Sequence, residues 1–305
     1  MTTDKMARTC SLLALASALW IGCDADGEEE TARRTAALTS LDQLVAMEQA
    51  MRPGERLLSV GERGALVVGA LPAEMPNTDQ PRAFAPIRRV GDKDRALPDD
   101  LGQVLDVRAL PDREELLILG ADHRLWRVGA DVALLDTEVE PPLSVSPSGQ
   151  YVAYARGMEP LFEVVVRDEA RHGEQVVSGE LQGCWSPAVG DRGQVMFMSS
   201  STGYGELYYT DGVDTPIKVT MRQQGQEIAT PTGPSAPLLS DGALFFEDEQ
   251  GLHRAALAGA GAIEGVRLVA PGAREIVWGV RGQYAWSQRE GKVSAHELVS
   301  RGGVR

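Results

Sequence analysis

Short apolar runs separated by turn residues fill the chain from Glu55 almost to its end. Runs rich in Val, Ile, Leu, Tyr and Phe and bounded by Gly, Pro, Asp and Ser predict β-strands joined by tight turns. Residues 40–51 differ, because their apolar positions recur at helical spacing behind a Ser40–Gln43 capping-box pattern, and Pro53-Gly54 ends the run. The pattern predicts a short helix over residues 39–53 and an all-β domain over residues 54–300.

The apolar runs recur as a unit of two strands around a turn. The clearest copies are Leu143–Tyr154, Gly183–Met198 and Trp278–Trp286, and the weaker ones are Val60–Val68, Leu110–Ile118 and Leu239–Phe246. Their turns fall near positions 62, 111, 147, 187, 240 and 280, and the intervals scatter around the forty-odd residues of a propeller blade. Further runs predict third strands at Leu125, Leu207 and Leu252, and fourth strands at Gln175–Ser178 and Pro216–Thr220.

One such sheet cannot bury both of its faces, but a circle of stacked sheets can. We therefore expect an all-β fold, a single β-propeller with six blades of four-stranded antiparallel sheets. The last repeat has no run for a fourth strand, and residues 301–305 read as a polar tail. We expect residues within Thr35–Leu58 to complete the last sheet, because this would close the ring without an open edge.

Two repeats carry a recognisable motif. The pattern Trp185-Ser-Pro, Phe197-Met-Ser-Ser-Ser and Gly205-Glu-Leu-Tyr resembles the TolB-like (WD-type) β-propeller repeat, and Ser146–Tyr154 fits it as well. The chain departs from the family where Ser148 and Ala188 stand in place of Asp. The resemblance covers roughly Glu55 to Leu298, and it implies a propeller, often of six blades, with partners among envelope proteins.

The first residues predict export. Lys5 and Arg8 precede the apolar run Ser11–Ile21, which has the length of a signal-peptide core and is short for a membrane span. The pair Gly22-Cys23 resembles the lipobox of bacterial lipoproteins, although Trp20 replaces the usual Leu. We therefore expect a signal peptide over residues 1–22, lipidation of Cys23 with palmitate or a similar chain, and a location on the inner or outer membrane.

A second reading of this segment stays open. Cleavage after Ala16-Ser17-Ala18 would release a soluble protein, and Cys23 could then pair with Cys184. In either case residues 23–38, which begin with a run of Asp and Glu, are expected to form an acidic flexible tether.

The net charge and the number of cysteines limit which ligands and partners the protein can have. The 305 residues carry a formal net charge of −14, so we expect no nucleic-acid ligand, and anionic lipid heads would repel the surface. Contact with a membrane is therefore expected through the lipid anchor alone, and we expect a monomer. Three cysteines supply neither a disulfide framework nor a C-x-x-C zinc pair.

No motif predicts catalysis. His123, His172, His253 and His296 lie among charged or turn residues, and neither H-E-x-x-H nor G-x-S-x-G occurs. We expect Cys184 to be a small buried residue, Ser199–Ser201 a polar strand end, and Glu247–Glu249 a solvated turn. Inter-blade packing is expected of four tryptophans, which are Trp126, Trp185, Trp278 and Trp286. The sequence thus predicts no catalytic, cofactor-binding or metal site.

Three functions fit these features. The first is a non-enzymatic binding or scaffolding module that takes envelope proteins or peptides. The alternative is a propeller enzyme, a lyase or hydrolase, with a cluster of at least three ionisable side chains in its central channel. The third is a structural lipoprotein with an apolar channel. Fold alone does not choose among them.

Overall fold

A computed structural model describes residues 51–61, 66–70, 83–85, 87–90, 101–111, 113–219, 222–223, 226–227, 237–258, 262–279, 284–289 and 292–298. The predicted signal peptide, the tether, Cys23, most of the predicted helix and the polar tail lie outside these residues. Within them the chain is all-β and no α-helix occurs. Nor do these residues include any helix that is long and apolar enough to cross a membrane.

Each sheet is an antiparallel meander whose strands follow one another in chain order. The first sheet has three strands, β1 (Glu55–Val60), β2 (Leu66–Ala70) and β3 (Ile87–Val90). The second has four, β4 (Val104–Ala109), β5 (Leu116–Gly120), β6 (Leu125–Val128) and β7 (Val132–Asp136). The third also has four, β8 (Val139–Val145), β9 (Tyr151–Arg156), β10 (Glu163–Asp168) and β11 (Gly173–Val176).

The fourth sheet comprises β12 (Cys184–Val189), β13 (Val195–Ser199), β14 (Glu206–Thr210) and β15 (Ile217–Val219). The fifth comprises β18 (Leu238–Ser240), β19 (Ala243–Asp248), β20 (Gly251–Ala258) and β21 (Ala262–Pro271). The last has three strands, β22 (Val277–Trp278), β23 (Tyr284–Arg289) and β24 (Lys292–Glu297). A small ribbon of β16 (Arg222–Gln223) and β17 (Gln226–Glu227) precedes the fifth sheet in the chain.

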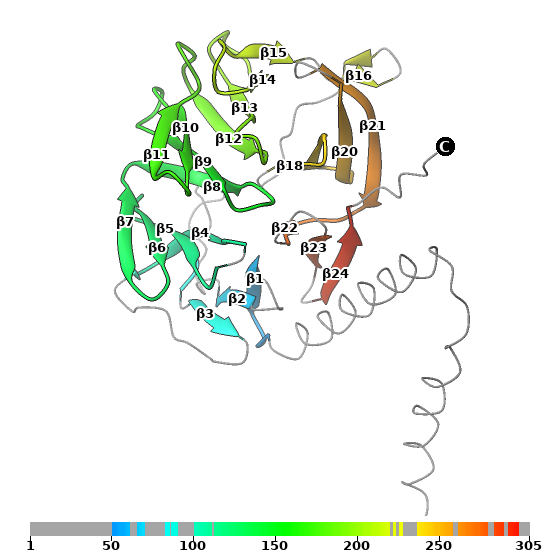
Figure 1. Cartoon of the computed structure of the whole chain (residues 1–305). Helices are drawn as coiled ribbons and strands as arrows, with labels where there is room; N and C mark the ends of the chain where they lie inside the picture. The colour runs from blue at the N-terminus through cyan, green and yellow to red at the C-terminus, as the bar shows by residue number, and fades with distance from the viewer. Residues whose placement is uncertain are drawn as a thin grey trace, which may run out of the picture. The chain divides into compact units, whose positions relative to one another are not determined.

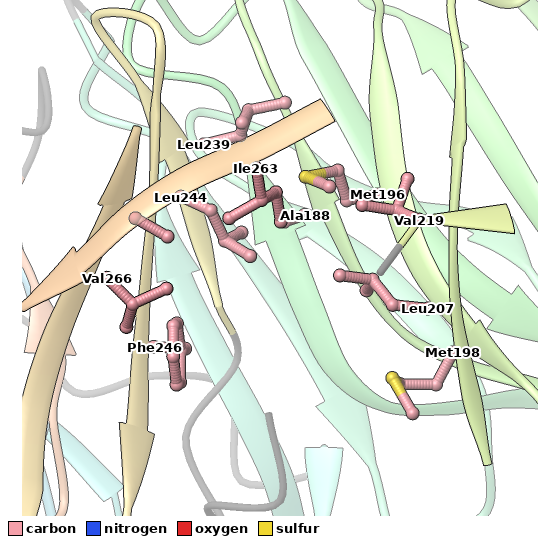
Figure 2. Close-up of a cluster of buried hydrophobic side chains, with 11 residues drawn as sticks. Ala188, Met196, Met198, Leu207, Val219, Leu239, Leu244, Phe246, Ile263 and Val266 are labelled. Carbon is pink, nitrogen blue, oxygen red and sulfur yellow. The ribbon is translucent and has the colours of Figure 1, made fainter. Parts of the chain in front are cut away.

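The hydrophobic core lies between neighbouring sheets. Figure 2 shows one cluster, in which Met196 and Leu207 of the fourth sheet face Leu244, Phe246 and Ile263 of the fifth. Comparable clusters join each successive pair of sheets, and another joins the first sheet to the last through Leu57, Val68 and Trp286. Because every sheet buries both faces against a neighbour, the sheets form the closed circle of a β-propeller (Figure 1).

Polar side chains fasten the first strand of one sheet to that of the next. Ser59 Oγ of β1 accepts a hydrogen bond from the Ala109 amide of β4 at 2.8 Å. Ser144 Oγ of β8 accepts one from the Val189 amide of β12 at 3.0 Å. These strands turn toward the middle of the circle (Figure 1), and such bonds satisfy backbone groups that no neighbouring strand reaches.

The prediction that every blade has four strands is wrong for the described residues. Among the described residues four sheets have four strands, and the first and last have three. Of the expected closing segment, Glu55–Leu58 belongs to β1 and pairs with β2 rather than with the last sheet, while residues 35–50 lie outside the described residues. The ring instead closes by packing, by a parallel bridge between Val60 and Gly279, and by Gln288 Oε1, which accepts a bond from the Leu57 amide at 2.9 Å.

The predicted repeat unit itself is confirmed. The two-strand unit predicted over Leu143–Tyr154 corresponds to β8 and β9, and the runs at Leu125, Leu207 and Leu252 are third strands of their sheets. The tryptophans lie on β6, β12, β22 and β23, and each packs in a cluster between two sheets, as predicted.

Candidate functional site

One cavity opens where the first strands of five sheets converge. Its walls come from β1, β4, β8, β18 and β22 and from residues next to them, and it has room for only a few water molecules. The lining consists mainly of serine hydroxyls, prolines, apolar side chains and backbone; it includes Ser59, Val60, Arg108, Leu143, Ser144, Pro147, Leu238 and Trp278. Among these described lining residues Arg108 is the one ionisable group.

Arg108 is engaged by neighbouring groups. Its Nε donates to the Leu143 carbonyl at 2.9 Å, and its Nη2 lies 3.2 Å from Asp106 Oδ2. The same carboxylate accepts a bond from the Leu143 amide at 2.7 Å. Burial raises the pKa of Asp106, although the Arg108 guanidinium and two backbone amides lower it. The pair thus ties β4 to β8, and the cluster of three ionisable side chains that an enzyme site would need is not seen in the described lining.

A second polar cluster lies between the second and third sheets. Glu169, in the turn after β10, has a fully buried carboxylate that accepts a bond from Arg167 Nε at 3.0 Å. Arg127 Nη1 of β6 lies 3.4 Å from it and Arg113 Nη1 lies 3.8 Å away. The arginines from both sheets thus supply the counter-charge that the buried Glu169 carboxylate needs, and removing one partner would leave an uncompensated buried charge.

The four histidines lie in turns or on the strands of hairpins. His123 and His172 take positive φ angles of 61° and 53° in turns. His253 is buried on β20, stacks on Phe246 with ring centroids 5.2 Å apart, and lies 2.8 Å from Asp248 Oδ1. His296 is partly buried on β24, and its Nε2 lies 2.7 Å from Ser287 Oγ.

The acidic run at the end of β19 is not a wholly solvated turn. Glu247 is buried, and its carboxylate accepts bonds from the amides of Glu275 and Ile276 at 3.3 and 3.4 Å. Arg274 donates to the carbonyl oxygens of Asp248 and Glu249. The run therefore anchors the segment that leads into β22, and no cation is needed to explain it.

Two other predictions are confirmed at the fourth sheet. Cys184 is fully buried, and burial raises the pKa of its thiol despite hydrogen bonds from Ser199 and Ser178. Ser199 ends β13, and its hydroxyl donates to the Gln182 carbonyl at 2.7 Å. Among the described residues no group of three or more His, Cys, Asp or Glu is placed to hold a metal ion.

Sequence reasoning missed a group of exposed apolar side chains. Met158 and Leu161, in the turn between β9 and β10, are 70% and 62% exposed, and Tyr204, in the turn between β13 and β14, is 80% exposed. Large apolar side chains that face water in neighbouring loops are typical of an interaction site. Met158 and Leu161 lie in one turn and Tyr204 lies in another, so no sequence signal links them and only the fold makes their turns neighbours.

Hydrogen bonds hold these turns side by side. The Cys184 amide donates to the Phe162 carbonyl at 3.0 Å, and the Ser200 amide donates to the Gly183 carbonyl at 3.0 Å. Residues 181–184 therefore lie between the two turns, and the Gln182 amide adds a bond to Ser201 Oγ at 2.6 Å. We call residues 157–162, 180–183 and 200–205 the loop face.

Comparisons with known proteins agree with the fold. No protein-family model matches the chain, and no curated protein matches it significantly. Among solved structures the tricorn protease is similar over 80% of this chain and 33% of its own, with 10% identity and a TM-score of 0.51. TolB from Acinetobacter baumannii matches over 78% of this chain and 62% of its own, with 14% identity and a TM-score of 0.49.

Dipeptidyl peptidase 4 of Porphyromonas gingivalis matches over 79% of this chain and 44% of its own, with 13% identity and a TM-score of 0.45. The chain thus spans less than two thirds of the length of each of these three proteins. At 10% identity the likeness to the tricorn protease concerns the fold alone and leaves the chemistry of this chain to its own residues. What the sheets and this likeness establish is a β-propeller fold.

Proposed function

We propose that this protein is a non-catalytic binding module of the bacterial cell envelope, which takes a protein or peptide partner on its loop face. The observation that carries the proposal is the exposure of Met158, Leu161 and Tyr204 on adjoining turns of two sheets. Aromatic and flexible apolar side chains on a rigid support are the groups that most often anchor protein interfaces. The sheets beneath supply that support, because both turns continue from strands packed in the core.

The proposal includes export and a lipid anchor. The signal peptide of residues 1–22 directs the chain out of the cytoplasm, and acylation of Cys23 attaches it to a membrane through the tether of residues 23–38. The propeller then acts as a monomer that faces the periplasm or the exterior. Labelled palmitate incorporated into the wild type but not into Cys23→Ser supports this part. A mature N-terminus directly after Ala18 would contradict it.

The binding function is tested by co-purification from detergent-solubilised membranes. One variant combines Met158→Ser, Leu161→Ser and Tyr204→Ser, and a matched control combines Val132→Ser, Leu134→Ser and Ile217→Ser, which are exposed on outer strands. We expect the loop-face variant to lose its partner about tenfold or more, as for loss of interface anchors, while the control retains it. Equal recovery of the partner with both variants would contradict the proposal.

A further inference from the structure

The loop face is rimmed by carboxylates. Residues 137–140, 157–163, 178–183 and 199–206 form this rim and the turns inside it, and they contain six glutamates and no lysine or arginine. The glutamates are Glu138, Glu140, Glu159, Glu163, Glu180 and Glu206. Arg156 borders these residues, and Arg156, Lys218 and His123 contact three of the six glutamates, so the unneutralised negative charge lies on the other three.

Backbone contacts place the rim beside the apolar side chains. The Gly157 amide donates to the Glu138 carbonyl at 2.9 Å, so the segment before β8 lies against the turn that carries Met158. Glu159 lies within that turn, and Glu180 is exposed in the segment that separates it from the turn of Tyr204. The segments that carry Glu138, Glu159 and Glu180, all of them exposed, therefore adjoin the turns that carry the apolar side chains.

Part of this negative charge is not neutralised within the protein. Arg156 contacts Glu163, Asp136 and Glu174, and Lys218 contacts Glu206. His123 Nδ1 lies 3.0 Å from Glu140. Burial raises the pKa of Glu140, His123 lowers it, and the Glu159 carboxylate raises it. The carboxylates of Glu140 and Glu159 therefore repel each other. Glu138, Glu159 and Glu180 have no ion pair among the described residues.

We propose that the partner of the loop face is a cationic protein segment, one that presents Lys or Arg beside large apolar side chains. This inference rests on the proposed binding function and specifies its partner. An apolar centre inside an acidic rim favours such a segment, because the rim attracts its charges while the centre buries its apolar groups. The same rim repels acidic peptides and anionic lipid heads.

The test uses the purified full chain and two fluorescent peptides of equal length, one alternating Lys with Leu and Tyr, the other Glu with Leu and Tyr. We expect the cationic peptide to bind and its affinity to fall with added salt. The triple variant Glu138→Gln, Glu159→Gln and Glu180→Gln is expected to weaken it about tenfold at low salt. The control Asp131→Asn, Asp214→Asn and Glu249→Gln removes three exposed charges elsewhere and is expected to leave the affinity unchanged.

The possible outcomes distinguish a failure of the cationic partner from a failure of the proposed binding function. Equal weakening by both triple variants would mean that only net charge matters, and would overturn the inference. Binding to phosphatidylcholine vesicles through Met158, Leu161 and Tyr204, without binding to the cationic peptide, would also overturn it in favour of a membrane surface. If the cellular partner is lost with the serine variant but retained with the glutamine variant, the binding function stands and the cationic partner is wrong.

Discussion

Glu169 shows how single buried charges hold this propeller together. Its carboxylate is fully buried at the junction of two sheets, and Arg167, Arg127 and Arg113 surround it. Asp106 and Glu247 act in a similar way, since each accepts hydrogen bonds from the backbone of a neighbouring segment. Individual polar residues therefore determine how one sheet is set against the next.

Neutralising Glu169 is predicted to destabilise the fold. Glu169→Gln leaves Arg127 and Arg167 without their buried counter-charge, which costs about 3 kcal/mol of unfolding free energy. Urea denaturation of the purified protein measures this loss. Glu163→Gln is the control, because Glu163 is 38% exposed and its pair with Arg156 contributes less. Equal losses in the two variants would contradict a structural role for burial at Glu169.

His296 is predicted to make stability depend on pH. Burial lowers its pKa below the usual 6.5, so the unfolded chain takes up the proton at a higher pH than the folded chain does. The contribution is complete above about pH 6.5 and is lost as the pH falls toward the lowered value. Thermal unfolding between pH 7.5 and 5 is expected to show a smaller decrease for His296→Gln than for the wild type. His172→Gln, changed at an exposed turn, should keep the wild-type decrease.

At the scale of elements, Gly183 sets the spacing of the two turns of the loop face. Its φ is +53°, and a β-carbon there would overlap Ser200 Oγ and come within 3.4 Å of the Pro160 carbonyl oxygen. An added β-carbon would force the Ser200 hydroxyl to rotate away from the Gly183 carbonyl and would hold a side chain in the left-handed region.

Gly183→Ala is therefore predicted to loosen the loop face. Gly203→Ala is the matched control, because Gly203 also has a positive φ, +87°, but nothing lies within 4 Å of an added β-carbon. Both variants bear a backbone cost of about 1 kcal/mol, and Gly183→Ala adds the overlap. Hydrogen exchange in residues 157–162 and 200–205 is expected to rise in Gly183→Ala alone. A rise of the same size in Gly203→Ala would mean that backbone strain explains the effect.

The strands were largely predictable from the sequence. Alternating apolar residues and turn signals identified the first three strands of most sheets, because that pattern is local. The burial of His253 could not be predicted from the sequence, since it depends on Phe246 and Asp248, which the hairpin places beside His253. The loop face was missed for the same reason, because the turns that carry Met158 and Tyr204 belong to two different sheets and adjoin only in the fold.

At the scale of the whole molecule, the described residues close the ring by contacts between the first and the last sheet. Gln288 Oε1 of β23 accepts a hydrogen bond from the Leu57 amide at 2.9 Å, and Gln288 Nε2 donates one to the Glu55 carbonyl at 3.2 Å. Leu57 and Trp286 pack together in the adjoining cluster. One side chain thus satisfies two backbone groups of β1 at the closure.

Gln288→Ala is predicted to weaken the closure. The Leu57 amide would lose its partner in a buried position, at a cost of about 2 kcal/mol. Amide exchange at Leu57 should accelerate together with a fall in the urea midpoint. Gln288→Glu keeps an acceptor for the Leu57 amide and is expected to protect that amide better than Ala does. Unchanged exchange at Leu57 in Gln288→Ala would show that packing alone closes the ring.

Site-specific photo-crosslinking in the producing cells tests the central claim, that the loop face is where this propeller meets a protein partner. A photoreactive amino acid is placed at Tyr204 and, in a separate strain, at Leu134, which is exposed on β7. The account predicts a discrete crosslinked protein adduct from position 204 and none from position 134. An adduct from position 134 alone, or from neither position, would contradict it.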